Sequence, residues 1–241
     1  MWDKLIRAWH VREVRNGVLF ALAMMVVFRI AANIPLPGVD LVALQNFIEG
    51  NKALGLLNLF AGGTIRNFSI VAMGVAPYIT ASIIMQLLGM IFPKIEEIQK
   101  DGDAGRRKIN QWTRLLTVPL AIVQSFGIIA LMRQSAVPIL TNRDPFHLAT
   151  IVITVTAGTM FLVWLGELIQ EKKVGNGMSL LIAAGILADL PTAASQFTAT
   201  FTGGTGDWIT IALYVASAIV LVVGVVFITE GQRNVPVQYA R

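Results

Sequence analysis

The chain of 241 residues is 55% hydrophobic and only 14% charged, and its mean hydropathy is +0.68. A soluble domain carries about 25% charged residues, so this composition excludes a water-soluble globular protein and indicates a membrane protein. The chain contains no cysteine, which excludes disulfides and thiolate chemistry, and its net charge of +5 matters chiefly through where the positive residues lie.

The first segment, 1–16, predicts an amphipathic helix that lies at the membrane surface. Trp2, Leu5 and Trp9 share one face because their spacing follows the helical period, whereas Arg7 lies off that face. Such a helix lies among lipid headgroups, and its positive residues favour the anionic lipids of the cytoplasmic leaflet. No small-residue cleavage site follows, so we expect no removable signal peptide.

Six apolar stretches predict helices that cross the membrane, each of which needs roughly 20 mainly apolar residues. These stretches are 17–34, 70–92, 115–132, 149–169, 177–190 and 208–229. The fifth is short enough for a re-entrant segment. We interpret it as a short span shielded by its neighbours, because the distribution of positive residues requires a crossing there.

That distribution is strongly asymmetric. With the N-terminus inside, 14 of the 19 Lys and Arg residues fall in inward segments, as expected for cytoplasmic loops. The inward segments are 1–16, 93–114, 170–176 and 230–241. A re-entrant fifth stretch would instead place the last positive residues outside. We therefore expect one membrane domain over 17–229, followed by the start of a cytoplasmic loop at 230–241.

Two loops have distinct compositions. The inward loop 93–114 is too charged to be buried, and its D-G-D-A-G sequence predicts the turn of a solvated hairpin. This loop either only sets the topology or also docks a cytoplasmic partner. The outward loop 191–207 is rich in Thr, Gly and Ala and predicts a flexible linker.

Signs of catalysis are scarce. His10 and His147 have no acidic or histidine neighbour at metal-ligand spacing, so we predict no metal site, no cofactor and no enzyme. Arg29, Glu167 and Asp189 lie within spans but near their ends, where they can reach the interface or form pairs. An ion-coupled carrier would need ionisable groups nearer the midplane.

Helix breakers and small polar side chains do occur at depth. Pro77 and Pro119 fall inside the second and third stretches, near Thr80, Ser82 and Gln124. Proline in a helix interior removes a hydrogen bond and kinks the helix. Ordinary bundle packing and a helix bent around a cavity are both consistent with this pattern.

The segment 59–69 is apolar enough to leave water but too short to cross. A short helix folded back into an outward-facing cavity accounts for both properties, because irregular backbone at depth must be lined by protein or water. A surface loop with scattered apolar residues is the alternative.

Several sequence motifs, taken in their order along the chain, resemble those of a known family. Residues 59–88, LFAGGTIRNFSIVAMGVAPYITASIIMQLL, resemble the plug and second helix of the SecY family, the protein-conducting channel subunit of the bacterial Sec translocon. Further segments agree in order: RIAANIPLPGV (29–39), DGDAGRRKINQWTR (101–114), GTMFLVWLGELI (158–169), GNGMSLLIAAGI (175–186) and EGQRNVPVQYAR (230–241). Family members have ten spans in two halves of five, so the chain resembles the N-terminal half plus a sixth helix, ending in the following cytoplasmic loop.

The resemblance implies a fold and a set of site residues. The fold is an all-α polytopic bundle of six transmembrane helices with a short re-entrant plug helix before the second. The implied plug is Phe60, Ala61, Gly62, Gly63, Thr64, Ile65, Arg66, Asn67, Phe68 and Ser69. The implied pore ring is Val75, Ile79, Ile83, Met178 and Ile182. The implied lateral gate includes Pro77, Thr80 and Gln124, and cytoplasmic partners would dock at Arg106, Arg107, Lys108 and Arg233.

Spacing is compatible with the implied ring. Val75, Ile79 and Ile83 follow one another at four-residue intervals and so share a helix face. A ring of aliphatic side chains can close by contact and dewetting and still yield to a passing chain. Outside the resemblance, such a stripe is more often plain core.

The resemblance also implies a function, partners and location. Unfolded polypeptides would cross the membrane, and signal or transmembrane segments would leave sideways into lipid. The implied partners are SecE and SecG, the SecA motor or a ribosome, signal peptides with unfolded preproteins, and anionic lipids. The location would be the cell inner (plasma) membrane with a cytoplasmic N-terminus. A small-solute secondary transporter is the alternative because it also uses broken helices, and an intramembrane enzyme would need a catalytic pair at depth.

Overall fold

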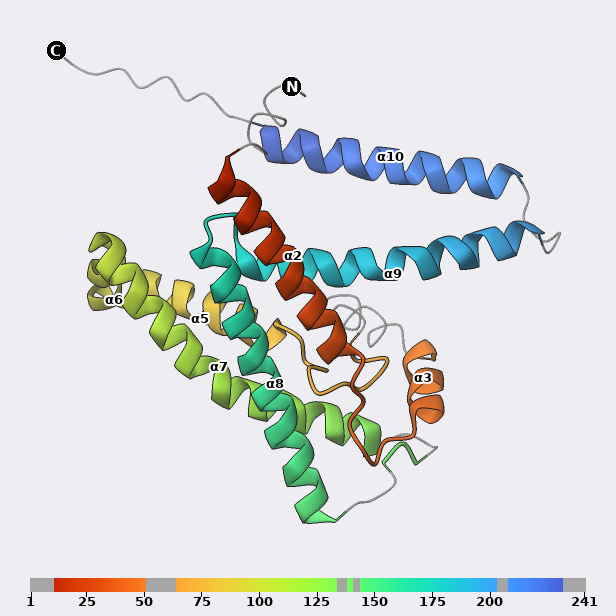
Figure 1. The fold of residues 1–241 in the computed structure, drawn as a ribbon, viewed down its shortest axis with the longest axis horizontal. Coiled ribbons are helices and arrows are strands. Elements are labelled where there is room, and N and C mark those ends of the chain that lie inside the picture. The colour runs from red at the N-terminus through yellow and green to blue at the C-terminus, as the bar shows by residue number, and fades with distance from the viewer. Residues whose placement is uncertain (1–10, 51–63, 134–137, 141–143, 203–207, 232–241) are drawn as a thin grey trace. The chain divides into compact units, whose positions relative to one another are not determined.

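The structure, a computed structural model, describes residues 11–50, 64–133, 138–140, 144–202 and 208–231. Its regular elements are α-helices, labelled in Figure 1. They are α2 (Arg12–Ala32), α3 (Leu41–Glu49), α5 (Ala76–Ile91), α6 (Pro93–Lys100), α7 (Gly102–Arg133), α8 (Pro145–Glu171), α9 (Gly177–Thr202) and α10 (Trp208–Glu230). Within the described residues, β pairing is limited to two isolated bridges. The predicted all-α fold is confirmed.

The chain divides into two compact units. The first comprises residues 1–189 and the second residues 190–241, so that α9 crosses the boundary and α10 belongs to the second unit. The predicted ring, plug and gate residues belong to the first unit, which contains α2 to α8 and the beginning of α9.

Apolar helices of membrane-crossing length support a multi-pass membrane protein. Among the described residues, α2, α7 and α8 are each long and apolar enough to cross. The helices α5 and α6 meet this criterion only together, and they are bent by 108° at their junction. The apolar parts of α9 and α10 are shorter, at residues 177–188 and 216–230. Six crossings therefore remain a prediction.

The second predicted span starts later than expected. Residues 64–75 form turns, and α5 begins only at Ala76 with Pro77 in its first turn. Proline is favoured there because the first turn has no partner for its missing N–H, whereas further inside it would break a hydrogen bond. Gly74 has φ +56, a conformation that glycine adopts without strain. Pro77 therefore starts the helix, and the predicted kink within the span is not observed.

The charged loop 93–114 also differs from the prediction, because most of it is helical. Phe92 is extended (φ −104, ψ 111) ahead of Pro93, as residues before proline prefer, and this produces the sharp bend between α5 and α6. The turn between α6 and α7 is short and has Gly102 at φ +62. Gly105 then allows the Ile98 carbonyl to approach the backbone of α7 closely. The predicted hairpin is thus a pair of helices.

Two other predicted boundaries shift. Helix α9 continues through Pro191 to Thr202, where a flexible linker was predicted over 191–207; residues 203–207 lie outside the described part. Neighbouring groups in membrane proteins can satisfy the carbonyl that a proline frees, so Pro191 does not end the helix. Of the predicted surface helix 1–16, residues 1–10 lie outside the described part, and the rest adjoins or belongs to α2.

Contacts at one end of the first unit join the beginning of the first predicted span to the predicted inward segment 170–176. A methyl group on Gly17 of α2 would lie 2.8 Å from Cγ2 of Val174, in the turn between α8 and α9. The Nζ atom of Lys172 in the same turn lies 5.2 Å from the centre of the Phe20 ring. At the opposite end, the Asp40 amide donates to the carbonyl of Ile139 over 2.9 Å. The beginning of α2 and the turn after α8 therefore share one end of this unit.

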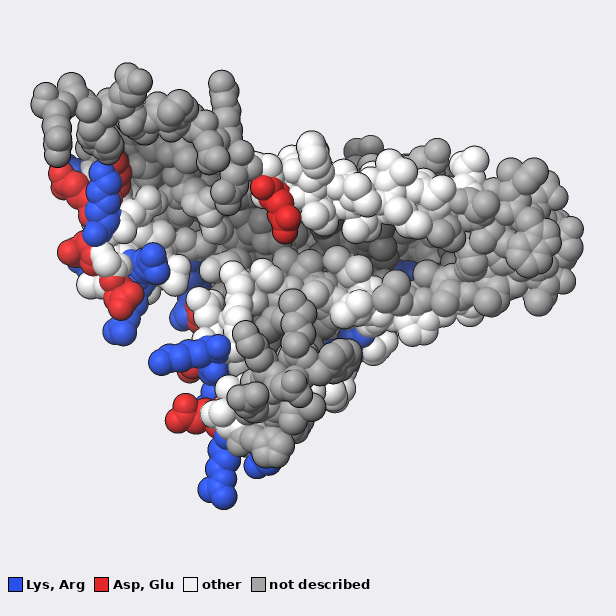
Figure 2. Space-filling view, turned by 90° about the horizontal axis from the view of Figure 1, so that it is seen from above, with Lys and Arg blue, Asp and Glu red and all other residues white. Residues whose placement is uncertain are grey.

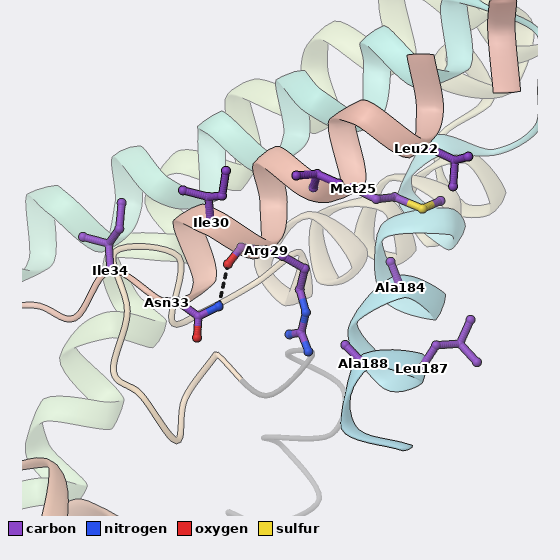
Figure 3. Close-up of a pocket in the computed structure, with 10 residues that line it drawn as sticks. Leu22, Met25, Arg29, Ile30, Asn33, Ile34, Ala184, Leu187 and Ala188 are labelled. Atoms are coloured by element: carbon purple, nitrogen blue, oxygen red, sulfur yellow. Dashed lines mark hydrogen bonds between the residues drawn. The ribbon is translucent and has the colours of Figure 1, made fainter. Parts of the chain in front are cut away.

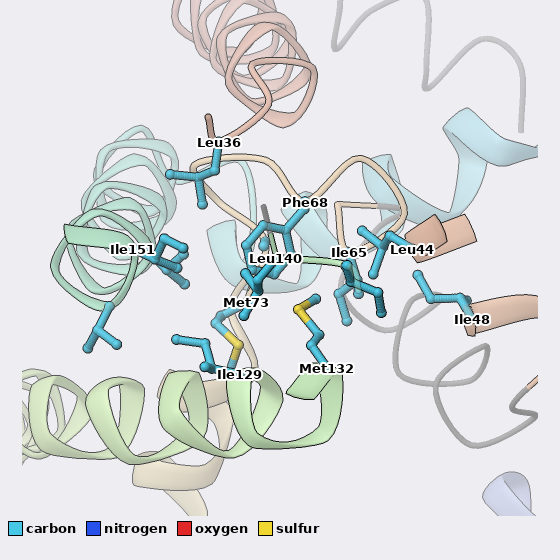
Figure 4. Packing of buried hydrophobic residues seen from close by; sticks show 14 of the residues in the cluster. Leu36, Leu44, Ile48, Ile65, Phe68, Met73, Ile129, Met132, Leu140 and Ile151 are labelled. Carbon is cyan, nitrogen blue, oxygen red and sulfur yellow. The ribbon is translucent and has the colours of Figure 1, made fainter. Parts of the chain in front are cut away.

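Two apolar clusters form the core of the first unit. A cluster that we call the outward cluster, because it includes residues of segments predicted to face outward, packs α3 and residues after α2 against α7, α8 and the turns before α5 (Figure 4). It comprises Leu36, Ala43, Leu44, Ile48, Ile65, Phe68, Ala72, Met73, Ile129, Met132, Ile139, Leu140, Ile151, Val152 and Val155. The central cluster comprises Ala21, Phe28, Ala31, Ala32, Val71, Val75, Leu162, Val163, Leu165, Ile169, Met178 and Leu181.

Two hydroxyl groups of α7 are bonded within that helix. Thr117 Oγ1 donates to the Thr113 carbonyl over 2.7 Å, and Thr113 Oγ1 donates to the Ile109 carbonyl over 2.8 Å. These residues continue with Ala121 and Ser125 as the buried stripe of α7. Small residues in this position let membrane helices approach closely.

Candidate functional site

Three of the five predicted ring residues lie together. Val75 (3% exposed) and Met178 (8% exposed) belong to the central cluster, and Ile182 packs against it. Val75 directly precedes α5 and Met178 opens α9, so the cluster joins the beginnings of two helices. The remaining members of the cluster are apolar side chains of α2 and α8 together with Val71 and Leu181 of α9.

The other two predicted ring residues lie on a different face. Ile79 is 37% exposed and Ile83 is 51% exposed, and neither belongs to a buried cluster. The buried side of α5 consists of Pro77, Ala81, Met85 and Gly89 at four-residue intervals. Ile79 and Ile83 fall midway between them and so point away from that side. The helix α5 therefore presents an apolar stripe that the described part of this chain does not cover.

The described part of the predicted plug is not helical. Residues 64–69 form turns, whereas Phe60, Ala61, Gly62 and Gly63 lie outside the described residues. Ile65 and Phe68 are buried in the outward cluster. Phe68 also has φ +38, which is uncommon for a residue with a Cβ atom and costs conformational energy.

Hydrogen bonds fasten this turn to the end of α2. The Leu36 amide donates to the Phe68 carbonyl over 3.0 Å, and the Ile70 amide donates to the Ile34 carbonyl over 3.0 Å. The buried Thr64 hydroxyl donates to the Ala72 carbonyl over 3.1 Å. Irregular backbone at membrane depth needs such partners because lipid offers none.

The predicted gate residues meet one another. Gln124 Nε2 of α7 lies 3.5 Å from Thr80 Oγ1 of α5, and the Thr80 hydroxyl donates to the Ala76 carbonyl over 3.1 Å. Pro77 is buried nearby in the first turn of α5. This contact joins α5 to α7 and so lies within one side of the implied gate.

The predicted docking residues are exposed. Arg106, Arg107 and Lys108 lie in the second turn of α7, whereas Arg233 lies outside the described residues. In Figure 2, Lys and Arg side chains lie among Asp and Glu side chains along one edge of the face in view, so the charges are mixed rather than of one sign.

An ion pair links α7 to α8 a few residues beyond these basic side chains, at Arg114. Arg114 forms two hydrogen bonds with Glu167, with Nε and one terminal nitrogen facing the two carboxylate oxygens. Glu167 is therefore paired, one of the two behaviours expected for an acidic residue near the end of a span. A cleft of about 430 Å³ lies beside the pair and is lined by Arg107, Asn110, Gln111, Arg114, Glu167, Gln170 and Glu171.

A pocket of about 780 Å³ that the sequence did not indicate lies between α2 and α9 (Figure 3). Its walls are mostly apolar, with Leu22, Met25 and Leu187 among them, and Arg29 extends into it. The Asn33 side chain donates to the Arg29 carbonyl over 2.8 Å. The only hint in the sequence was an arginine within an apolar span.

Metal-ligating residues are dispersed. Across the described ranges, no three His, Asp or Glu side chains gather as a metal site would require.

Comparison with known proteins identifies the family. A family model described as SecY matches residues 69–241. The chain belongs to the SecY family. The protein translocase subunit SecY of Corynebacterium glutamicum is 44% identical over 248 residues, which covers 98% of this chain and 55% of that protein. The SecY subunits of Streptomyces galbus and Staphylococcus aureus are each 42% identical over 100% of this chain, covering 58% and 57% of those proteins.

The chain thus spans little more than half the length of these SecY relatives. Among solved structures, it is similar to Sec61 in the canine ribosome-channel complex from the endoplasmic reticulum, with a TM-score of 0.60 and 18% identity. That alignment covers 90% of this chain and 48% of the Sec61 chain. At this identity the likeness shows a shared fold.

We predict that the Gln124–Thr80 contact contributes about 0.6 kcal/mol, a typical value for a hydrogen bond between membrane helices. Thr80→Val and Gln124→Leu, made singly and together in the detergent-solubilised chain, should show this coupling in the free energy of unfolding. Thr150→Val is the matched control, because its hydroxyl donates to the Phe146 carbonyl of its own helix. Equal coupling of Gln124→Leu to both threonine variants would contradict the assignment.

Proposed function

We propose that the chain forms the amino-terminal part of a protein translocation channel subunit. Unfolded polypeptides would cross the membrane through it, and signal or transmembrane segments would leave sideways into lipid. The observation that carries the proposal is the gathering of Val75, Met178 and Ile182 around one apolar cluster in a member of the SecY family. The family and its relatives give no support to the solute-transporter alternative.

The proposed constriction combines this cluster with the free stripe of α5. Ile79 and Ile83 are exposed in this chain and continue the four-residue spacing from Val75. In a complete channel these side chains would face the pore and touch a passing polypeptide. Because they are apolar, they hold back water and ions by dewetting and offer no charge that would retain a substrate.

The proposed plug, Phe60–Ser69, would close this constriction from outside. Its described end is held by Ile65 and Phe68 in the outward cluster and by the bonds to the end of α2. This supports a plug that is fixed where it joins the turns before α5, so that any displacement would involve the residues before Phe68.

The proposed lateral gate would have α5 and α7 as one of its two sides. Pro77, Thr80 and Gln124 lie on these helices, and the Gln124–Thr80 contact holds the two helices together. On this proposal α5 and α7 move as one wall, and the gate opens between them and helices outside this chain.

Partners and location follow from the family by analogy. Exposed Arg106, Arg107 and Lys108 would dock the SecA motor or a ribosome, with Arg233 contributing, and would lie near anionic lipids. SecE and SecG would be the membrane partners, and signal peptides with unfolded preproteins the substrates. The location would be the inner (plasma) membrane, with the N-terminus in the cytoplasm.

We expect a chimera to export protein. This chain replaces the matching part of the Corynebacterium glutamicum SecY subunit in cells depleted of their own subunit, and the amount of unprocessed preprotein is measured. The chimera should reduce preprotein accumulation toward the level of the unmodified relative, because the matched regions share 44% identity over 98% of this chain. A chimera that inserts stably but leaves preprotein unexported would contradict the proposed function.

We expect Ile79→Asp to make the purified chimera leak ions without impairing its folding. Ile79 is already partly exposed, so the carboxylate would wet the constriction without entering the central cluster, whereas Val75→Asp would bury a charge there. The conductance of planar bilayers is the measurement, and Ile79→Leu is the control that keeps the stripe apolar. Equal conductance of the Asp and Leu variants would remove Ile79 from the ring.

We expect a cysteine at Phe60 to cross-link to a cysteine at Ile182 in the idle chimera. The cross-link should disappear when a stalled preprotein occupies the pore, because the plug then leaves the constriction. The native chain has no cysteine, so each engineered thiol within it reports without background. Phe60→Cys paired with Gly127→Cys is the control, since Gly127 of α7 has open space around it. A cross-link that persists during stalling would contradict a movable plug.

A further inference from the structure

Two glycines of α8 lie where the two ring-bearing segments touch that helix. We propose that Gly158 and Gly166 are positioning residues, which set where Val75 and Met178 stand and thereby whether the constriction closes. This inference rests on the proposed function, in which those two residues belong to the ring. Neither glycine would touch the translocating chain itself.

Gly158 receives the backbone of the turns before α5. A methyl group on Gly158 would collide with the Ile70 carbonyl oxygen, and it would lie 2.8 Å from the Ile70 carbonyl carbon and 3.2 Å from Val71 Cα. These neighbours are main-chain atoms, so no side-chain rotation could relieve the collision. Val71 itself is 0% exposed, which leaves the turn no free space in which to retreat.

The opposite side of this turn is also fixed. The Ile70 amide donates to the Ile34 carbonyl at the end of α2 over 3.0 Å. Ile70 is therefore held between α2 and α8. Five residues later the chain reaches Val75, after a turn closed by the Gly74 amide donating to the Val71 carbonyl over 2.8 Å. The place of Val75 thus follows from the place of Ile70.

Gly166 receives the beginning of α9. A methyl group there would lie 2.6 Å from Sδ and 2.8 Å from Cε of Met178. The preceding residue, Gly177, packs its backbone on Gly166 so closely that a methyl group on Gly177 would lie 2.7 Å from the Gly166 carbonyl carbon. A methyl group at position 166 would therefore make the flexible end of the ring residue Met178 move to another position.

The two contact positions, Gly158 and Gly166, lie on the same helix, α8. Gly158 and Gly166 are eight residues apart, which corresponds to about 12 Å along a helix axis. Between them, Leu162, Val163 and Leu165 are buried in the central cluster with both ring residues. The axial offset between the Val75 segment and the Met178 segment is therefore set by α8.

The experiment uses the exporting chimera and its Gly158→Ala, Gly166→Ala and Gly127→Ala variants. Gly127→Ala is the matched control, because it adds the same methyl group to a membrane helix at a position with nothing within 4 Å. Three properties are measured: thermal stability in detergent, ion conductance of planar bilayers without substrate, and the length of bismaleimide that cross-links Val75→Cys to Met178→Cys.

We expect Gly158→Ala to raise background conductance roughly tenfold, the change that follows if the closed arrangement loses about 1.4 kcal/mol. The preferred cross-linker length should change as well. Gly166→Ala should raise conductance in the wild-type background but add nothing in a Met178→Ala background, because it acts only by displacing that side chain. Gly127→Ala should match the unmodified chimera in all three properties.

Each other outcome has a distinct meaning. If Gly158→Ala and Gly166→Ala reduce thermal stability but leave conductance and cross-linker length unchanged, the glycines serve packing alone and the inference is overturned. If Gly158→Ala fails to fold, the Gly166 and Met178 cycle decides, and additive effects there refute the inference. The preferred cross-linker length reports directly on the distance between positions 75 and 178. A chimera that neither exports protein nor holds back ions, but whose preferred cross-linker length changes with the glycine variants, would refute only the proposed function.

Discussion

Close backbone packing holds the first unit together. Lipid offers no hydrophobic force that presses one apolar helix against another, so membrane helices depend on van der Waals contact at small residues. Helix α8 shows this most clearly: α2, α5 and α7 all pack on it, and its glycines admit main-chain atoms of neighbouring segments. A single methyl group at such a place displaces a backbone, whereas the same group on the open side of α7 meets nothing.

The irregular backbone of the first unit also needs hydrogen-bond partners inside the membrane, where lipid offers none. The turns over residues 64–75 meet this need by bonding to the end of α2 and to one another, and their apolar side chains enter both clusters. This segment joins the outward cluster to the central one and therefore connects the proposed plug to the proposed ring. Its unusual conformations, at Phe68 and Gly74, lie along this connection.

The sequence predicted helix existence better than helix boundaries. The fourth stretch, 149–169, lies within the longer helix α8, whose two ends are marked by Pro145 and Glu171. The second stretch misled because hydropathy does not distinguish a helix from buried turns: Ile70, Val71 and Met73 are as apolar as the helix that follows. The sequence predicted a kink at Pro77, but Pro77 lies in the first turn of α5, where proline starts a helix and does not bend it.

The candidate site was only partly accessible from the sequence. Periodicity placed Val75, Ile79 and Ile83 on one face, yet only packing against α2 and α8 separates the buried Val75 from the exposed pair. The meeting of Val75 with Met178 depends on contacts between segments about one hundred residues apart, which no local pattern encodes. The pairing of Arg114 with Glu167 is hidden for the same reason.

The hydroxyls of Thr80, Thr113 and Thr117 have a mechanical consequence. Each is bonded to a carbonyl of its own helix, so it makes little directional demand on the neighbour across the interface. The register between α5 and α7 therefore depends on apolar packing and on the Gln124–Thr80 bond, a directional contact between side chains of the two helices. At 3.5 Å this bond is long, so most of the alignment of the two helices rests on how closely their apolar surfaces fit.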